Sequence, residues 1–195
     1  MSGIETASML LEQVGKVHLY DFNKRYREGH IKRCHGDLKA ANLWVCPPDN
    51  DSQAQERLIP LDCVDFNPEF CNIDTLSDVA MLAIDLEMRL GNPVGNGNEK
   101  LSGQQLARHF LHTYLKASGE SETVWPLLEY YMTEKAMVCA YMSVQYDGLP
   151  TLGEKYLEVV LTHAKELAKY LPPHIGKKIV KPLEPVTVGA TIQHV

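Results

Sequence analysis

The chain lacks an excess of basic residues, since its 19 Lys and Arg against 25 Asp and Glu give a formal net charge of -6. Nucleic-acid-binding domains normally present a basic surface, so the composition disfavours that class. The five cysteines include no Cys-x-x-Cys pair, which disfavours both a disulfide framework and a zinc ribbon. We therefore expect small core cysteines in a protein of the reducing cytoplasm.

Long apolar runs and glycine-rich loops are also missing. No stretch of about eighteen uncharged apolar residues occurs, and the N-terminus has neither the basic nor the apolar region of a secretory signal. Neither secretion nor membrane spanning is predicted. Residues 1–33 contain no Gly-rich phosphate-binding loop. The length of 195 residues, 45% of them hydrophobic, suits one globular domain.

Helical periodicity dominates what is present. Apolar residues recur at helical spacing through Leu10, Val14, Val17 and Tyr20, which predicts a helix from about residue 4 to 28. The segment from Thr75 to Leu90 is apolar almost all round, so it is expected to be a buried, central core helix. Amphipathic segments predict three further helices at about 101–117, 122–146 and 151–171.

One β-hairpin is predicted between these helices. Its strands are Asn42–Cys46 and Arg57–Leu61, which bracket a polar turn. The fold class is therefore mainly α with a small β-hairpin (α+β), with residues 1–171 as one lobe. Residues 172–195 are predicted to be an extended tail with some strand character. That tail is either an edge strand or partner-binding arm, or a segment draped over its own lobe.

The hairpin brings acidic residues to one end. Asp37 comes just before its first strand, while Asp62 and Asp65 follow its second. Asp37 follows His35-Gly36 and precedes Asn42 by five positions, which is the offset between the catalytic Asp and the metal-binding Asn of the kinase loop. Phosphoryl transfer needs a carboxylate near the acceptor hydroxyl and magnesium held by hard oxygen ligands. The pattern therefore indicates phosphoryl-transfer chemistry.

These residues resemble the aminoglycoside phosphotransferase and choline kinase superfamily, which has a protein-kinase-like fold. The family loop reads His-Gly-Asp-x-x-x-x-Asn, and its metal-binding strand ends in Ile-Asp-Phe or Ile-Asp-Trp. The likeness is closest to a little-characterised bacterial branch. It runs from about residue 25 to 90, and more weakly to about 145. The resemblance implies the C-terminal catalytic lobe of such an enzyme.

The resemblance implies a role for each matching residue. Asp37 would be the catalytic base. Lys39 departs from the family, which usually has His at this position, and as in protein kinases it would contact the transferring phosphate as a catalytic and cofactor-binding residue. Asn42 would bind cofactor and Mg²⁺. Asp62 matches the strand-end Asp most closely and Asp65 is the second candidate metal ligand, although the order of the two stays open.

Further positions are expected to support the loop. Asp74 and Asp78 resemble the later acidic pair of the superfamily, and Asp78 would hold the catalytic loop from the first turn of a helix. His35 would be structural, with its ring beneath the loop. Four aromatic residues are candidates for stacking on a substrate, although most are expected in the core: Trp44, Tyr130, Tyr131 and Tyr141.

The expected function is ATP- and Mg²⁺-dependent phosphorylation of a hydroxyl on a small molecule. Full members of the superfamily have an N-terminal β-rich lobe, whereas the residues before Asp37 read as helix here. A separate N-terminal lobe or a second copy of the chain is therefore an expected partner. One alternative is an incomplete or non-catalytic kinase-like lobe that acts as a binding module. Another is a metal hydrolase that uses the same acids.

Overall fold

Helices α1 (Gly3–Val17) and α2 (Leu19–Arg27) begin the computed structural model, which describes residues 3–47, 56–89 and 101–179. The single helix expected over residues 4–28 is therefore two helices, separated at His18. Leu10 and Val14 are buried, whereas Val17 and Tyr20 are exposed, so the apolar stripe ends where the chain bends. After the bend, α2 places Arg25 against Asp74.

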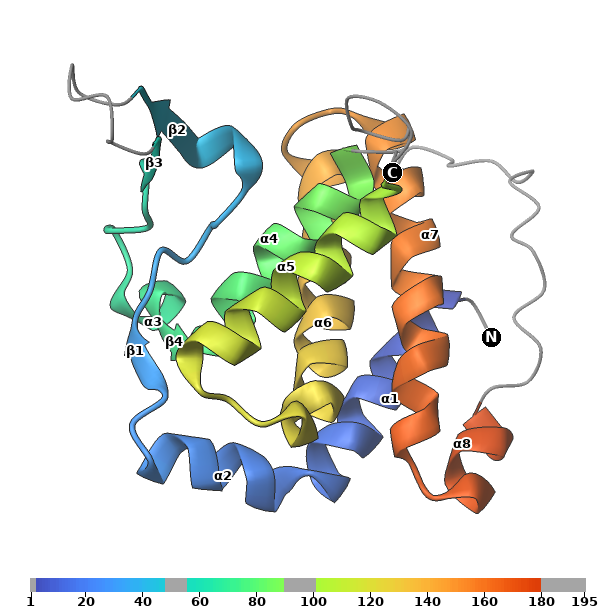
Figure 1. The fold of residues 1–195 in the computed structure, drawn as a ribbon. Helices are drawn as coiled ribbons and strands as arrows, with labels where there is room; N and C mark the ends of the chain where they lie inside the picture. Colours follow the sequence, from blue (N-terminus) through green and yellow to red (C-terminus); the bar gives the residue numbers. More distant parts are fainter. Residues whose placement is uncertain (1–2, 48–55, 90–100, 180–195) are drawn as a thin grey trace.

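A bundle of helices forms the main body of the fold. Its members are α1, α4 (Thr75–Arg89), α5 (Gly103–Ser118), α6 (Trp125–Gln145) and α7 (Pro150–Leu167). Helix α6 packs against α1, α4 and α7, while α5 covers α4 (Figure 1). The expected core helix over residues 75–90 is confirmed as α4, and it shares the centre of the bundle with α6.

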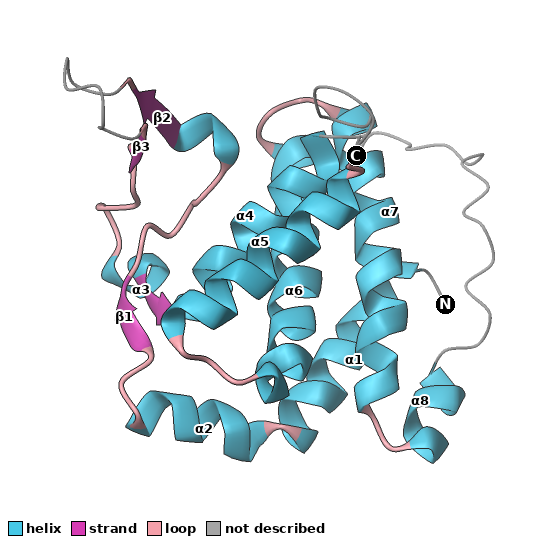
Figure 2. Ribbon diagram, in the orientation of Figure 1, coloured by secondary structure: helices cyan, strands magenta, loops and turns pink. Residues whose placement is uncertain are grey.

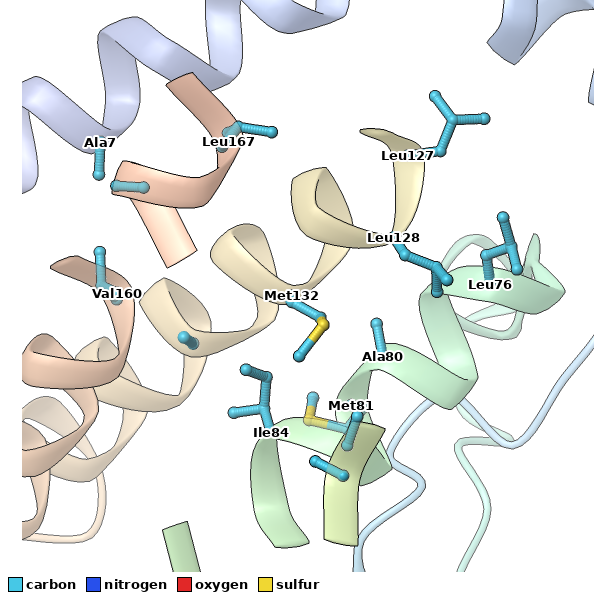
Figure 3. Close-up of a cluster of buried hydrophobic side chains, with 14 of the residues drawn as sticks. Ala7, Leu76, Ala80, Met81, Ile84, Leu127, Leu128, Met132, Val160 and Leu167 are labelled. Atoms are coloured by element: carbon cyan, nitrogen blue, oxygen red, sulfur yellow. The ribbon is translucent and has the colours of Figure 1, made fainter. Parts of the chain in front are cut away.

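The core lies mostly between α4 and α6. Ile84 and Ala80 of α4 lie near Met132 and Leu128 of α6, and Leu167 of α7 extends the same apolar cluster toward α1 (Figure 3). Full burial of a side chain as large as Leu or Ile stabilises the folded state by about 1.5–3 kcal/mol. The bundle is thus a rigid support for the loops beside it.

Local signals set the helix boundaries. Ser102 and Gln105 form a capping box at the start of α5, and Gly119 ends that helix with a φ of 72°. The 3₁₀ turn η2 (Glu122–Val124) leads into α6, and a proline lies in the first turn of both α6 and α7. The three helices expected over residues 101–171 are confirmed.

Two antiparallel strand pairs lie along one side of the bundle (Figure 2). The expected hairpin is confirmed as β2 (Leu43–Cys46) and β3 (Arg57–Pro60), although most of its turn lies outside the described residues. The second pair, β1 (Ile31–Arg33) with β4 (Asn72–Asp74), was not expected. The mainly α class with a small β component is therefore confirmed.

Short elements complete the fold: η1 (Ala40–Asn42), α3 (Pro68–Cys71), η3 (Ala168–Tyr170) and α8 (Pro173–Ile179). The sequence predicted an extended tail over residues 172–195, but its first residues form helix α8 instead. Ile179 of this helix is buried against the bundle. The rest of that tail lies outside the described residues. So does the segment 91–97, for which the glycine, asparagine and proline residues of the sequence predict a loop.

Two smaller observations concern expectations from composition. Cys71 and Cys139 are buried as expected, but Cys63 is exposed, so not every cysteine belongs to the core. Within the ranges that the structure describes, no helix is both long and apolar enough to cross a bilayer.

Candidate functional site

The candidate site is the segment His35–Asn42, here called the loop, which joins β1 to β2. Residues 61–64, after β3, run beside it in the opposite direction. Leu61 N donates to Asn42 O at 2.8 Å, and Val64 N donates to His35 O at the same distance. The hairpin therefore brings Asp62 and Asp65 to the end of the sheet where Asp37 lies, as the sequence predicted.

The beginning of the loop is held by Asp78, in the first turn of α4. The carboxylate accepts the backbone N–H groups of His35 at 2.9 Å and Gly36 at 3.0 Å. Gly36 has a φ of +85°, and an added Cβ would lie 2.8 Å from Phe70 O, so glycine is required by both backbone conformation and space. The expectation that Asp78 holds this loop is confirmed.

His35 is buried beneath the loop, as expected of a structural residue. Its Nε2 lies 2.7 Å from Leu61 O, which can only accept, so Nε2 has the proton and donates. The other ring nitrogen, Nδ1, accepts the backbone N–H of Asp37 at 3.3 Å. The ring thus connects the loop to the end of β3.

The end of the loop is held by a second carboxylate of α4. Asp85 Oδ2 accepts the backbone N–H of Ala40 at 2.8 Å, at the first residue of η1. Within this turn Asn42 N donates to Lys39 O at 2.9 Å, and the Asn42 amide Nδ2 donates to Asp37 O at 3.0 Å. That last bond uses the nitrogen of the amide and leaves its oxygen available as a metal ligand.

Asp37 and Lys39 form an ion pair at 2.8 Å, and both side chains are about one-third exposed. Burial alone would lower the pKa of Lys39, but the hydrogen bond and charge of Asp37 outweigh it and raise that pKa. Lys39 is therefore a cation at neutral pH. The pair combines a carboxylate that can accept a proton with a cation that can attract an anionic group.

A groove of about 950 Å³ opens beside this pair. The loop forms one wall, while α6 and α7 form another through aromatic and charged side chains: Tyr130, Tyr131, Glu134, Lys135 and Tyr156. Of the four aromatic candidates, Tyr130 and Tyr131 line the groove. Trp44 and Tyr141 are exposed rather than buried in the core, so for these two the expectation of core positions is wrong.

The candidate metal ligands lie around the loop rather than in the groove. Asn42, Asp62 and Asp65 are absent from its lining, and both aspartates are exposed. Asp62 has a φ of 61°, a left-handed conformation that Asp tolerates better than most residues. Among the residues described, no cluster of three or more His, Cys, Asp or Glu side chains could hold a metal. The candidate set itself, one amide and two carboxylates, has the hard oxygen donors that Mg²⁺ prefers.

Asp74, expected as part of an acidic pair, is buried in an ion-pair network. Arg25 of α2 donates to its two carboxylate oxygens at 2.6 and 2.8 Å, and to Glu120 at 2.9 Å. Asp74 also forms part of the groove wall. Arg25 belongs to no motif, so the sequence predicts no role for it. Asp85 lies within the segment that resembles the superfamily, as a charge in an apolar helix seven positions after Asp78, but the resemblance implies no role for it.

Comparisons with known proteins add no assignment. No protein-family model, no curated protein and no solved structure matches the chain. The function must therefore be argued from the residues and their geometry.

Proposed function

We propose that the chain is the catalytic lobe of an ATP- and Mg²⁺-dependent phosphotransferase that acts on a hydroxyl group of a small molecule. The proposal depends chiefly on one observation: Asp37 and Lys39 lie together at the wall of a groove, on a loop anchored to the core helix α4. The likeness of the loop to the aminoglycoside phosphotransferase and choline kinase superfamily supports the same conclusion.

Each residue has a role that its surroundings permit. Asp37 accepts the proton of the acceptor hydroxyl as that oxygen bonds to the γ-phosphorus of ATP, while the bond from this phosphorus to the β-phosphate oxygen breaks and ADP leaves. Lys39 attracts the anionic phosphate, and its movement toward that anion frees the Asp37 carboxylate from the present ion pair. Asn42 with Asp62 or Asp65 would hold Mg²⁺, which supplies charge neutralisation on the phosphates.

The groove supports a small acceptor rather than a polymer. Its volume of about 950 Å³ is in the range of small-molecule sites, and aromatic rings on α6 give a surface on which such a molecule can pack.

Calorimetric titration with Mg-ATP, together with phosphate transfer to a panel of small alcohols, tests the proposal. Asp37→Asn should abolish transfer while leaving the melting temperature near that of the unaltered protein, because Asp37 is partly exposed. A chain that neither binds Mg-ATP nor transfers phosphate would refute catalysis. Hydrolysis without nucleotide would instead indicate a metal hydrolase.

A non-catalytic binding module is the second candidate. The observation in its favour is the ion pair itself, because Lys39 occupies the carboxylate that catalysis would need. Tight binding of a small molecule in the groove, unchanged by Mg-ATP and without turnover, would support this reading. Addition of a separate β-rich lobe that restores transfer would oppose it.

A further inference from the structure

We propose that Asp85 is a positioning residue, which fixes the second half of the loop and, through it, Asn42. This inference rests on the proposed function. Asp85 is only 2% exposed and lies on a helix whose neighbouring residues are mostly apolar. A buried carboxylate loses its hydration, so it needs compensating hydrogen bonds, which an apolar residue at the same place would not.

The hydrogen bond that Asp85 accepts from Ala40 joins α4 to the turn η1. Ala40 is the first residue of η1, and the first N–H groups of a helical turn have no acceptor within that turn. Asp85 Oδ2 supplies the acceptor at 2.8 Å from a distant part of the chain. It therefore caps η1 as a local Ser or Asp caps an ordinary helix.

Fixing η1 fixes the residues on either side of it. Asn42 belongs to the turn and donates through its side chain to Asp37 O. Lys39 immediately precedes the turn, and its carbonyl accepts Asn42 N. The position of Ala40 thus determines how Asn42 lies relative to Asp37. The proposed reaction requires these two residues to be correctly placed with respect to each other.

Asp78 and Asp85 anchor opposite ends of the loop and can be separated by experiment. They are seven residues apart, so both lie on one face of α4 with about 10 Å between them along the axis. Asp78 accepts the N–H groups of His35 and Gly36 at the beginning. Asp85 accepts that of Ala40 near the end. Removing one anchor should release its own end of the loop first.

Backbone amide exchange measured by NMR tests the anchors directly. In the unaltered protein the Ala40 amide should be protected. Asp85→Ala should raise its exchange rate at least about tenfold while His35 and Gly36 stay protected, and Asp78→Ala should show the reverse pattern. Asp85→Asn keeps an oxygen acceptor, so Ala40 should stay within about threefold of the unaltered rate. Amides of α6 report global unfolding.

Two exchange results would overturn the inference. The first is an unprotected Ala40 amide in the unaltered protein. The second is an equal rise at Ala40, His35 and the α6 amides in Asp85→Ala, which would assign Asp85 to the general stability of the bundle. Neither measurement requires nucleotide or turnover, so both decide the inference even if the proposed function fails.

Kinetics add a readout that a purely structural role would not change. Asp85→Ala should lower kcat on the order of tenfold to a hundredfold, because small misplacement of reacting groups costs that much, while the KM of the acceptor stays within about twofold. Asp85→Asn should recover most of the loss. Unaltered kcat in Asp85→Ala would contradict a positioning role.

Discussion

Gly36 is the residue at which backbone conformation limits the loop most. Gly36→Ala should lower the free energy of unfolding by about 2–3 kcal/mol, because it adds left-handed strain and a contact with Phe70 O. Gly29→Ala is the matched control: its φ is +79° but nothing lies within 4 Å of the added methyl group, so about 1 kcal/mol is expected. Urea unfolding measures both, and equal losses would refute the steric part.

Arg25 is the residue on which the network around Asp74 depends. Arg25→Met removes the guanidinium that pairs with Asp74 and Glu120, and it leaves the buried charge of Asp74 without a cation, so it should cost about 3–5 kcal/mol of unfolding free energy. Lys24→Met, which removes an exposed lysine 3.9 Å from Glu28, should change stability by less than about 0.5 kcal/mol. Denaturant titration at neutral pH distinguishes the two.

The Arg25 variant should also change the response to acid. Burial raises the pKa of Glu120, but the hydrogen bond and charge of Arg25 outweigh it, so the net pKa is lowered. The contribution of the pair is therefore complete above the unfolded pKa of about 4.3 and is lost as the pH falls through the lowered value. The difference in unfolding free energy between the unaltered protein and Arg25→Met should narrow below about pH 4. A constant difference down to pH 3 would contradict this assignment.

At the scale of single residues, the sequence predicts the members of a local motif better than it predicts residues whose partners are distant in the chain. The spacing of Asp37, Asn42 and Asp62 can be read from the chain because local strand and loop geometry brings them together. The partners of Arg25 are 49 and 95 positions away, and no local pattern encodes such distances. The buried charge of Asp85 in the apolar helix α4 is likewise explained by a distant contact, because Ala40 is 45 positions away along the chain.

Among the helices, α4, α6 and α7 are joined by one buried polar cluster. His163 of α7 lies 2.8 Å from Glu129 of α6 and 3.0 Å from Glu87 of α4. Burial alone would lower the pKa of His163, but the two carboxylates outweigh it and raise that pKa to about 9. The imidazolium therefore holds three helices together at neutral pH.

This cluster predicts a pH dependence on the alkaline side. Because the folded pKa is raised, its contribution is complete below the unfolded pKa of about 6.5 and is lost as the pH rises through about 9. Unfolding free energy of the unaltered protein should fall by a few kcal/mol over that interval, whereas His163→Gln should begin lower and change less. Urea midpoints from pH 6 to 9.5 measure this.

His112→Gln is the control for the cluster. Its ring is half-exposed and pairs with the exposed Glu122 at 3.4 Å, so the pH profile should stay that of the unaltered protein. If His163→Gln keeps the same profile as well, the three-helix role of His163 is wrong.

Helices with strong periodicity and the two strands of the hairpin were predictable, whereas the other short elements were not. The segment that forms α4 is apolar over several turns, and α5 has both cap signals, so their bounds follow closely from the sequence. Strands β1 and β4 have three residues each and little alternation, and they form because Ile31 pairs with Asp74 across the fold. Helix α8 contains Pro173 and Gly176, two residues of low helix propensity, so the sequence did not predict a helix there.

At the scale of the molecule, the helical bundle and the hairpin differ in how much they bury. Leu128→Ala removes a fully buried side chain between α6 and α4 and should cost about 2–5 kcal/mol. Leu58→Ala, on the exposed face of the hairpin, should cost less than about 0.5 kcal/mol. Similar losses in the two variants, measured by thermal unfolding, would mean that the hairpin belongs to the same cooperative core.

The loop of the proposed chemistry lies between the buried bundle and the exposed hairpin. The loop is connected to the bundle through Asp78 and Asp85, and to the hairpin through Leu61 and Asn42. The bundle therefore supplies rigidity, while the hairpin determines where the exposed candidate ligands Asp62 and Asp65 lie. The acceptor itself cannot be deduced from periodicity, because the groove is shaped by side chains from loop and helices together.

Helix α4 also limits which changes in chain length the protein tolerates. One residue inserted between Asp78 and Asp85 would rotate the second carboxylate by about 100° around the axis and move it by about 1.5 Å, away from Ala40. A deletion would rotate it by the same angle in the opposite sense. Related genes should therefore conserve this seven-residue interval without gaps, while insertions and deletions accumulate in the surface turns.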